Sequence, residues 1–79
     1  MTVEFEADRV LDVRGTLCPM PIIEAKRAID QAASGQIIKV LATDPGSLSD
    51  MPAWARRTGN KLLQATQEDG IFVFFVQKV

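Results

Sequence analysis

Residues 61–79 read KLLQATQEDGIFVFFVQKV, and this stretch carries the clearest fold signal in the chain. Two runs rich in apolar and β-branched side chains flank the sequence Glu-Asp-Gly. An Asp-Gly pair between two such runs is a strong short-range signal for a β-hairpin. We therefore predict a strand over 61–67, a turn over 68–70 and a second strand over 71–79.

The second strand of this hairpin is apolar on both of its alternating faces. One face carries Ile71, Val73 and Phe75, and the other carries Phe72, Phe74 and Val76. Helices on one side of a sheet would cover only one of these faces, so the other would stay exposed or meet another chain. We favour a central strand whose second face is shielded by long side chains from its neighbours. The alternative is an interaction surface, with Phe72 and Phe74 forming a partner surface or a weak dimer contact.

Upstream of the hairpin, strand and helix patterns alternate. The run QIIKVLA at 36–42 is rich in β-branched residues and predicts a strand that is buried on at least one face. The run ADRVLDVRG at 7–15 predicts a first strand. The resulting order is βαβαββ, in which two helices can cover one face of a four-stranded mixed sheet. We therefore predict an α+β fold, a two-layer α/β sandwich.

The first helix is predicted over 19–34, because apolar residues recur there at helical spacing. Its buried stripe is predicted to contain Ile22, Ala25, Ile29 and Ala32. Gly35 stands at the position expected just past the end of a helix.

The second helix is predicted to begin between Ser47 and Asp50 and to end at Gly59-Asn60. Ser47 with Asp50 resembles a capping box. A start at Ser49 is easier, because it places Pro52 in the first turn, where its missing N–H costs least. The inner stripe is predicted to contain Met51, Trp54, Ala55 and Thr58.

Length and composition restrict the classes of function. The chain has 79 residues, one cysteine and no histidine. Its size suits a single domain over 1–79, with residues 1–6 held loosely. One cysteine without histidine argues against a structural zinc site and against Cys-His or Ser-His-Asp catalysis. We expect no cofactor and no metal.

Charge and hydropathy restrict the classes of binding partner and the compartment of the protein. The nine basic and ten acidic residues are interspersed and give a net charge of −1, unlike the clustered basic stripe of a nucleic-acid-binding protein. The apolar runs are too short to span a membrane. The N-terminal MTVEFEADR lacks the pattern of a secretory signal. A lone free cysteine without an export signal predicts the reducing cytoplasm.

The only cysteine lies in LCPMPI at 17–22, between the first predicted strand and helix. We expect Cys18 to be the N-cap, with Pro19 at the first helical position and Pro21 at the third, where the missing N–H groups cost little. Because the N-terminus of a helix is its positive end, we predict a lowered pKa for the thiol of Cys18. We expect this thiol to be accessible and moderately activated, and Arg14 would add to this effect. The alternative is a buried cysteine that packs as a small hydrophobe.

A reactive thiol without a resolving cysteine or an imidazole base suits a group carrier. Such a thiol can accept a sulfur atom as a persulfide and yield it to the thiol of another protein.

The stretches LDVRGTLCPMPIIEAKRAI and DPGSLSDMPAWARRTGN resemble the TusA/SirA family of small sulfur-carrier proteins, whose fold is a βαβαββ sandwich. The resemblance implies a sulfurtransferase that carries a persulfide on Cys18, with Pro19 and Pro21 as structural members of a Cys-Pro-x-Pro motif. Asp44 and Asp50 also fall on recurrent family positions. No chemical step is assigned to them, and a helix cap is the simplest role for Asp50.

The resemblance also implies partners. Family members take sulfur from a cysteine desulfurase or a rhodanese. They pass it to an acceptor, such as a DsrE-like protein, toward tRNA thiolation, molybdenum-cofactor synthesis or sulfur oxidation. The charges of Arg14, Lys26 and Arg27 would help to dock a partner. Some members carry a second cysteine where this chain has Ala55, so a mechanism with two thiols is not expected here.

A different class of function is also compatible with the residues. The chain would then be a non-catalytic interaction or regulatory module in which the cysteine is incidental.

Overall fold

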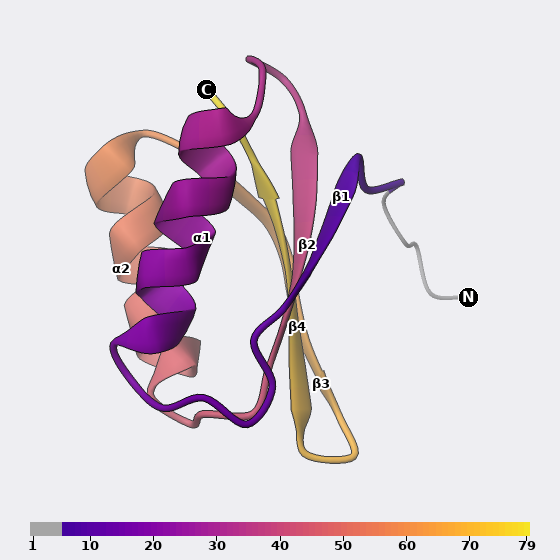
Figure 1. Ribbon diagram of the computed structural model, residues 1–79, viewed down its shortest axis with the longest axis vertical. Helices are drawn as coiled ribbons and strands as arrows, with labels where there is room; N and C mark the ends of the chain where they lie inside the picture. Colours follow the sequence, from indigo (N-terminus) through magenta and orange to yellow (C-terminus); the bar gives the residue numbers. More distant parts are fainter. Residues whose placement is uncertain (1–5) are drawn as a thin grey trace.

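The computed structural model describes residues 6–79, which fold into a sheet layer and a helix layer (Figure 1). The elements are β1 (Arg9–Asp12), α1 (Met20–Gln31), β2 (Ile37–Ala42), α2 (Ser47–Thr58), β3 (Lys61–Glu68) and β4 (Ile71–Gln77). The predicted order βαβαββ is confirmed. The prediction of a loosely held N-terminus falls mainly on residues 1–5, which lie outside the described residues.

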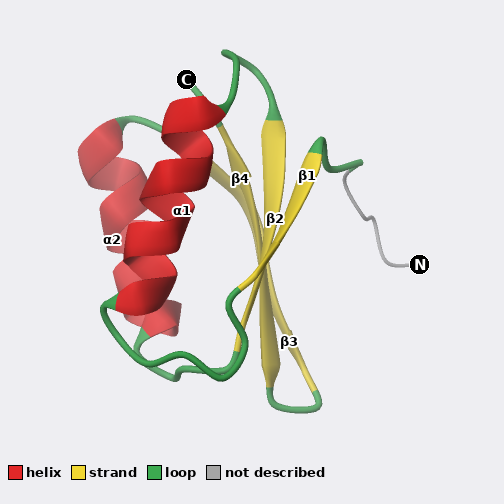
Figure 2. Ribbon diagram, viewed as in Figure 1, coloured by secondary structure: helices red, strands yellow, loops and turns green. Residues whose placement is uncertain are grey.

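The four strands form one mixed sheet in the order β1-β2-β4-β3. β1 pairs with β2 in parallel, whereas β2 with β4 and β4 with β3 are antiparallel. Both helices pack on the same face of the sheet, which confirms the predicted two-layer α+β sandwich (Figure 2). Because β1 and β2 are parallel neighbours, the loops that follow them leave the sheet at the same end.

The β3–β4 hairpin forms where the sequence predicts it. Asp69 and Gly70 adopt positive φ angles of 51° and 78°, as a tight two-residue hairpin turn requires. β3 runs one residue further than predicted, to Glu68. A β-bulge between Leu62 and Gln64 shifts its register against β4.

The two faces of β4 are buried in different ways. Phe72, Phe74 and Val76 belong to the core beneath the helices. The alternative in which Phe72 and Phe74 form a partner surface or a dimer contact is therefore wrong. On the opposite face, Phe75 is only 2% exposed, and the ammonium nitrogen of Lys39 lies 5.7 Å from the centroid of its ring. The predicted shielding by long side chains is thus confirmed at Phe75.

The first helix is shorter than predicted, spanning Met20–Gln31 instead of 19–34. Ala32 leaves the helix in an extended conformation, and the ammonium group of Lys78 donates a 2.8 Å hydrogen bond to the carbonyl of Ile29. A lysine partner for a late helical carbonyl helps to stop the helix here. Gly35, with φ of 88°, belongs to the following turn and not to the helix end.

The inner face of α1 also differs in part from the predicted stripe. Its buried residues are Pro21, Ala25, Ala28 and Ile29. Ile22 and Ala32, which the prediction placed on the stripe, are only partly buried.

The second helix begins at Ser47, two residues before the start that we favoured, so Pro52 lies inside the helix. Both the N–H and the hydroxyl of Ser47 bond to the carbonyl of Asp44, at 3.0 and 2.6 Å. Gly46 is the N-cap and no side chain caps the helix, so the predicted capping box does not form.

The end of α2 is confirmed, because Gly59 takes the left-handed conformation at the C-cap with φ of 79°. The buried residues of α2 are Ser47, Met51, Trp54 and Ala55. The predicted Thr58 is exposed instead.

Candidate functional site

The thiol of Cys18 is free and exposed, in the loop between β1 and α1. The prediction of an accessible cysteine is confirmed, and the alternative of a buried one is wrong. Helix α1 begins one residue later than predicted, so Pro19 is the N-cap and Pro21 is the second helical residue. Cys18 therefore precedes the cap. The Cys18–Pro19 peptide bond is cis.

Two carboxylates from the neighbouring loop and helix hold Cys18. The backbone N–H of Cys18 donates to Oδ2 of Asp44 at 3.0 Å, and its thiol donates to Oδ2 of Asp50 at 3.2 Å. Asp44 follows β2, and Asp50 lies in the first turn of α2. A further hydrogen bond of 2.9 Å, from the N–H of Gly15 to the hydroxyl of Thr43, ties the two loops together.

These contacts raise the pKa of the Cys18 thiol above its ordinary value. The hydrogen bond to Asp50 is the main cause, followed by desolvation and by the negative charges of Asp50 and Asp44. The predicted lowering of the pKa is therefore wrong. A thiol beside carboxylates resists ionisation, because the thiolate would add a third negative charge.

The start of α1 supplies little to offset these charges. Pro19 and Pro21 have no N–H to donate. The N–H of Met20 already bonds to the carbonyl of Leu17 at 2.9 Å, and that of Ile23 bonds to Pro19 at 3.1 Å. The prolines that shape the helix start thus remove donors that a thiolate would need.

Arg14 does not act on the thiol as predicted. Its guanidinium donates two hydrogen bonds of 2.9 and 2.8 Å to the carboxylate of Asp12. This contact lowers the pKa of Asp12 to about 2. Arg14 is therefore paired with the last residue of β1.

Lys26 and Arg27 lie on the exposed face of α1, and each forms an ion pair within that helix. Lys26 pairs with Asp30 at 2.8 Å, and Arg27 pairs with Glu24 at 3.2 Å. Exposed pairs of this kind contribute little to stability. A role of Lys26 and Arg27 in docking stays a prediction.

A shallow pocket of about 210 Å³ opens beside the thiol. It is lined by Cys18, Pro19, Ile22, Asp50, Ala53, Trp54 and Arg57. Within residues 6–79, the buried indole nitrogen of Trp54 has no hydrogen-bond partner and Arg57 forms no ion pair.

Asp50 and Arg57 are not among the site residues predicted from the sequence. The spacing of Asp50, Trp54 and Arg57, four residues and then three, places all three on one face of α2. This spacing could have indicated that Asp50 and Arg57 lie close together. Nothing in the sequence, however, indicated that this face meets Cys18.

Exposed apolar side chains surround the same end of the molecule. They are Leu17, Met20, Ile23 and Leu48, and we call them the apolar rim. Leu17 is the most exposed of these four at 74%. Leu17 and Met20 lie next to the motif, whereas Leu48 lies at the start of α2.

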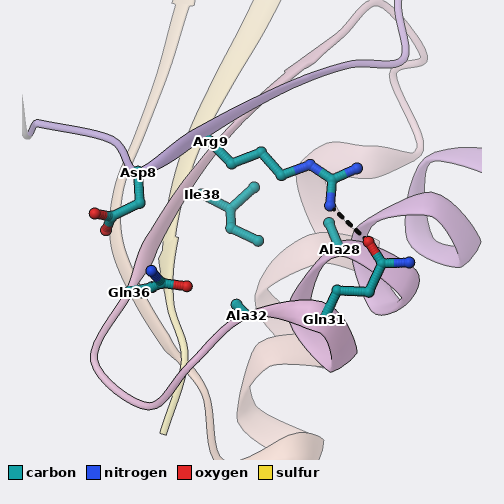
Figure 3. Close-up of a pocket in the computed structure, with 7 residues that line it drawn as sticks. All are labelled: Asp8, Arg9, Ala28, Gln31, Ala32, Gln36 and Ile38. Atoms are coloured by element: carbon teal, nitrogen blue, oxygen red, sulfur yellow. Dashed lines mark hydrogen bonds between the residues drawn. The ribbon is translucent and has the colours of Figure 1, made fainter.

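A second pocket lies at the opposite end of the β1–α1–β2 unit (Figure 3). Its polar groups are occupied by structural contacts. Arg9 donates to Gln31 at 2.8 Å, and Asp8 accepts the N–H of Ile37 at 2.8 Å. Gln36 accepts the N–H of Ala33 at 2.8 Å. We therefore place the candidate site at Cys18 and not in this pocket.

The chain is similar to several known proteins. The family model for the sulfurtransferase TusA matches residues 9–78. A putative sulfur carrier protein of Bacillus subtilis, YrkI, is 45% identical over 73 residues, which cover 92% of this chain and 97% of the relative. The sulfur carrier protein TusA of Allochromatium vinosum is 45% identical over 71 residues, with 90% and 93% covered.

A solved structure is similar in fold. The crystal structure of a SirA-like protein from Desulfitobacterium hafniense has a TM-score of 0.77 and 24% identity, and the match covers 87% of this chain and 95% of the other. Together with the match over residues 9–78, these similarities establish that the chain belongs to the TusA sulfurtransferase family.

Proposed function

We propose that this protein is a sulfur carrier that holds sulfane sulfur as a persulfide on Cys18 and passes it to a partner in a sulfur relay. The observation that carries the proposal is a single exposed thiol within the Cys-Pro-x-Pro sequence of a chain that belongs to the TusA family. Pro19 and Pro21 support the site by fixing the start of α1. The proposed domain is the whole chain.

Loading is an exchange between two sulfur centres. The thiol of Cys18 loses its proton, and the thiolate attacks the outer sulfur of a persulfide on the donor. A new S–S bond forms at Cys18 while the S–S bond of the donor breaks. The donor thiolate leaves and takes up a proton. Unloading is the same exchange with the acceptor thiol as the attacking group, so no external oxidant or reductant is needed.

A sulfur-carrier role implies relay partners. We propose a cysteine desulfurase or a rhodanese as the donor, and a DsrE-like protein or another relay member as the acceptor. The apolar rim supports docking at this end, because its side chains are exposed and Leu17 is the sequence neighbour of Cys18. Lys26 and Arg27 extend this surface along α1 and would contribute charge recognition.

The partner also has to supply most of the acid–base groups, because the chain has no histidine. We propose the reducing cytoplasm as the compartment, where a free thiol persists. Within residues 6–79, no helix is long and apolar enough to cross a membrane.

Intact-protein mass spectrometry tests the proposal. The protein is incubated with a desulfurase and cysteine, or with a rhodanese and thiosulfate, and its mass is then measured. We expect the wild type to gain one sulfur atom and Cys18→Ser to gain none. A wild type that gains no sulfur from either donor system would instead support the non-catalytic interaction module.

A further inference from the structure

We propose that Asp50 is a positioning residue that holds Cys18 of the empty carrier as a thiol, so that the thiolate forms only when a partner weakens this contact. The inference rests on the proposed function of Cys18 as the sulfur-bearing residue. It begins from geometry. The thiol donates to Oδ2 of Asp50 at 3.2 Å, and this contact joins the loop before α1 to the first turn of α2.

Asp44 fixes the same loop from a second direction. Its Oδ2 accepts the backbone N–H of Cys18 at 3.0 Å. With the N–H and the S–H both bound to carboxylates, the cysteine is held at the backbone and at the side chain. Asp44 and Asp50 are both half-buried, so their charges are only partly screened by water.

Gly46 leaves room for the carboxylate of Asp44. Its φ of −61° is one that any residue adopts, so the backbone does not require glycine. A Cβ at this position would stand 3.2 Å from Oδ2 of Asp44 and 3.6 Å from Oδ2 of Asp50. The first distance is tighter than an ordinary contact and the second is ordinary, so glycine leaves space for the Asp44 oxygen that accepts the N–H of Cys18.

The other charged groups that face the thiol do not cancel these carboxylates. Arg57 of α2 lines the same pocket but is not among the groups that shift the pKa of Cys18. Arg14 of the preceding loop is paired with Asp12. The surroundings of Cys18 are thus acidic, and they favour the protonated thiol at neutral pH.

This contact distinguishes the empty carrier from the loaded one. In a persulfide the Sγ atom of Cys18 is bonded to the second sulfur and carries no hydrogen. The hydrogen bond that Sγ donates to Asp50 is therefore lost when the carrier is loaded. Because the thiolate is the form that reacts, Asp50 suppresses unspecific oxidation of an exposed cysteine until a donor docks.

The test is the pH dependence of alkylation of Cys18 by iodoacetamide, a neutral probe. The wild type is compared with Asp50→Asn and Asp50→Ala, since the asparagine oxygen can still accept the S–H hydrogen bond but carries no charge. Asp30→Asn is the matched control, because it removes the same charge near the other end of α1. Circular dichroism confirms that each variant is folded.

We expect the midpoint of the profile to fall in both Asp50 variants and to stay unchanged in the control. A fall of one pH unit corresponds to about a tenfold rise in the thiolate fraction below the midpoint. Midpoints that are unchanged or raised in both variants, or an equal fall in Asp30→Asn, would overturn the inference.

The alkylation assay uses no sulfur donor, so its outcome is separate from the loading experiment. A wild type that never accepts sulfur overturns the proposed function. An unmoved midpoint in a protein that does accept sulfur overturns only the role of Asp50.

Discussion

The two ends of the β1–α1–β2 unit both contain charged and polar side chains, but these side chains have different surroundings. At the end with Asp8 and Arg9, the polar side chains are paired with the backbone or with each other (Figure 3). At the end with Cys18, the thiol is exposed and its sequence neighbour Leu17 is an exposed residue of the apolar rim. There the indole nitrogen of Trp54 also lacks a partner within residues 6–79.

The difference indicates where another protein binds. Paired polar groups contribute to the fold and need no further ligand. Exposed apolar side chains instead gain from contact with a second surface. We therefore expect substitutions at the thiol end to change sulfur transfer, and substitutions at the paired end to change only stability.

The largest effect is expected from Leu17→Glu, which places a charge in the apolar rim next to Cys18. We expect sulfur loading by a donor protein to slow about tenfold or more, which corresponds to about 1.4 kcal/mol of docking energy. Val10→Glu is the matched control, because Val10 is 58% exposed but lies on β1. Equal slowing in both variants, or none in Leu17→Glu, would contradict the assignment of the docking end.

Arg14→Ala tests whether this arginine belongs with the paired groups. We expect the pKa of Asp12 to rise from about 2 toward its ordinary value of 3.8, because the side-chain hydrogen bonds from Arg14 are lost. The measurement is an NMR titration of the carboxyl carbon. Alkylation of Cys18 should keep the wild-type pH profile, and a shifted midpoint would show that Arg14 acts on the thiol after all.

The same pair sets a pH dependence of stability. The folded-state pKa of Asp12 is depressed, so its stabilising contribution is present above the ordinary value of 3.8 and is lost as the pH falls toward about 2. The stability difference between wild type and Arg14→Ala should therefore shrink over this window. A difference that stays constant would exclude the ion pair as its source.

A smaller effect is expected from Gly46→Ala, which places a methyl group 3.2 Å from the carboxylate of Asp44 and in ordinary contact with that of Asp50. We expect the alkylation midpoint of Cys18 to fall, but by less than in Asp50→Asn, because both charges remain. Ser49→Ala in the same turn is the control. A midpoint as high as that of the wild type would show that the carboxylates adapt without losing Cys18.

The smallest effect is expected at the paired end, from Arg9→Ala. The variant loses one exposed hydrogen bond to Gln31. We therefore expect its free energy of unfolding to fall by less than about 1 kcal/mol. Urea denaturation measures this change. Sulfur loading should be unaffected, and a loss as large as that in Leu17→Glu would remove the distinction between the two ends.

The parts of the fold that depend on neighbours in sequence could be predicted from the sequence. The hairpin turn at Asp69 and Gly70 is one such part, because the two residues themselves provide the positive φ angles. The helix boundaries were less accurate. A start at Ser49 would place Pro52 in the first turn. Instead α2 begins at Ser47, whose hydroxyl bonds to the carbonyl of Asp44, so Pro52 lies inside the helix.

The site was predicted only in part, for a physical reason. The Cys-Pro-x-Pro sequence indicates Cys18 directly, but the residue that controls its ionisation lies 32 positions away. From the sequence alone, Asp50 is interpreted as a helix cap, because Asp is common at the start of helices. Only the parallel pairing of β1 and β2 brings the loops together, and this reverses the direction of the pKa shift.

In the proposed relay, one thiol both receives and releases sulfur. The most direct measurement is the intact mass of the wild type after loading by a donor, and again after addition of an acceptor protein with a free thiol. We expect a gain of one sulfur atom located on the peptide that contains Cys18, followed by return to the original mass as the acceptor gains that sulfur. A sulfur atom that never appears, or that appears and cannot be passed to any acceptor thiol, would contradict it.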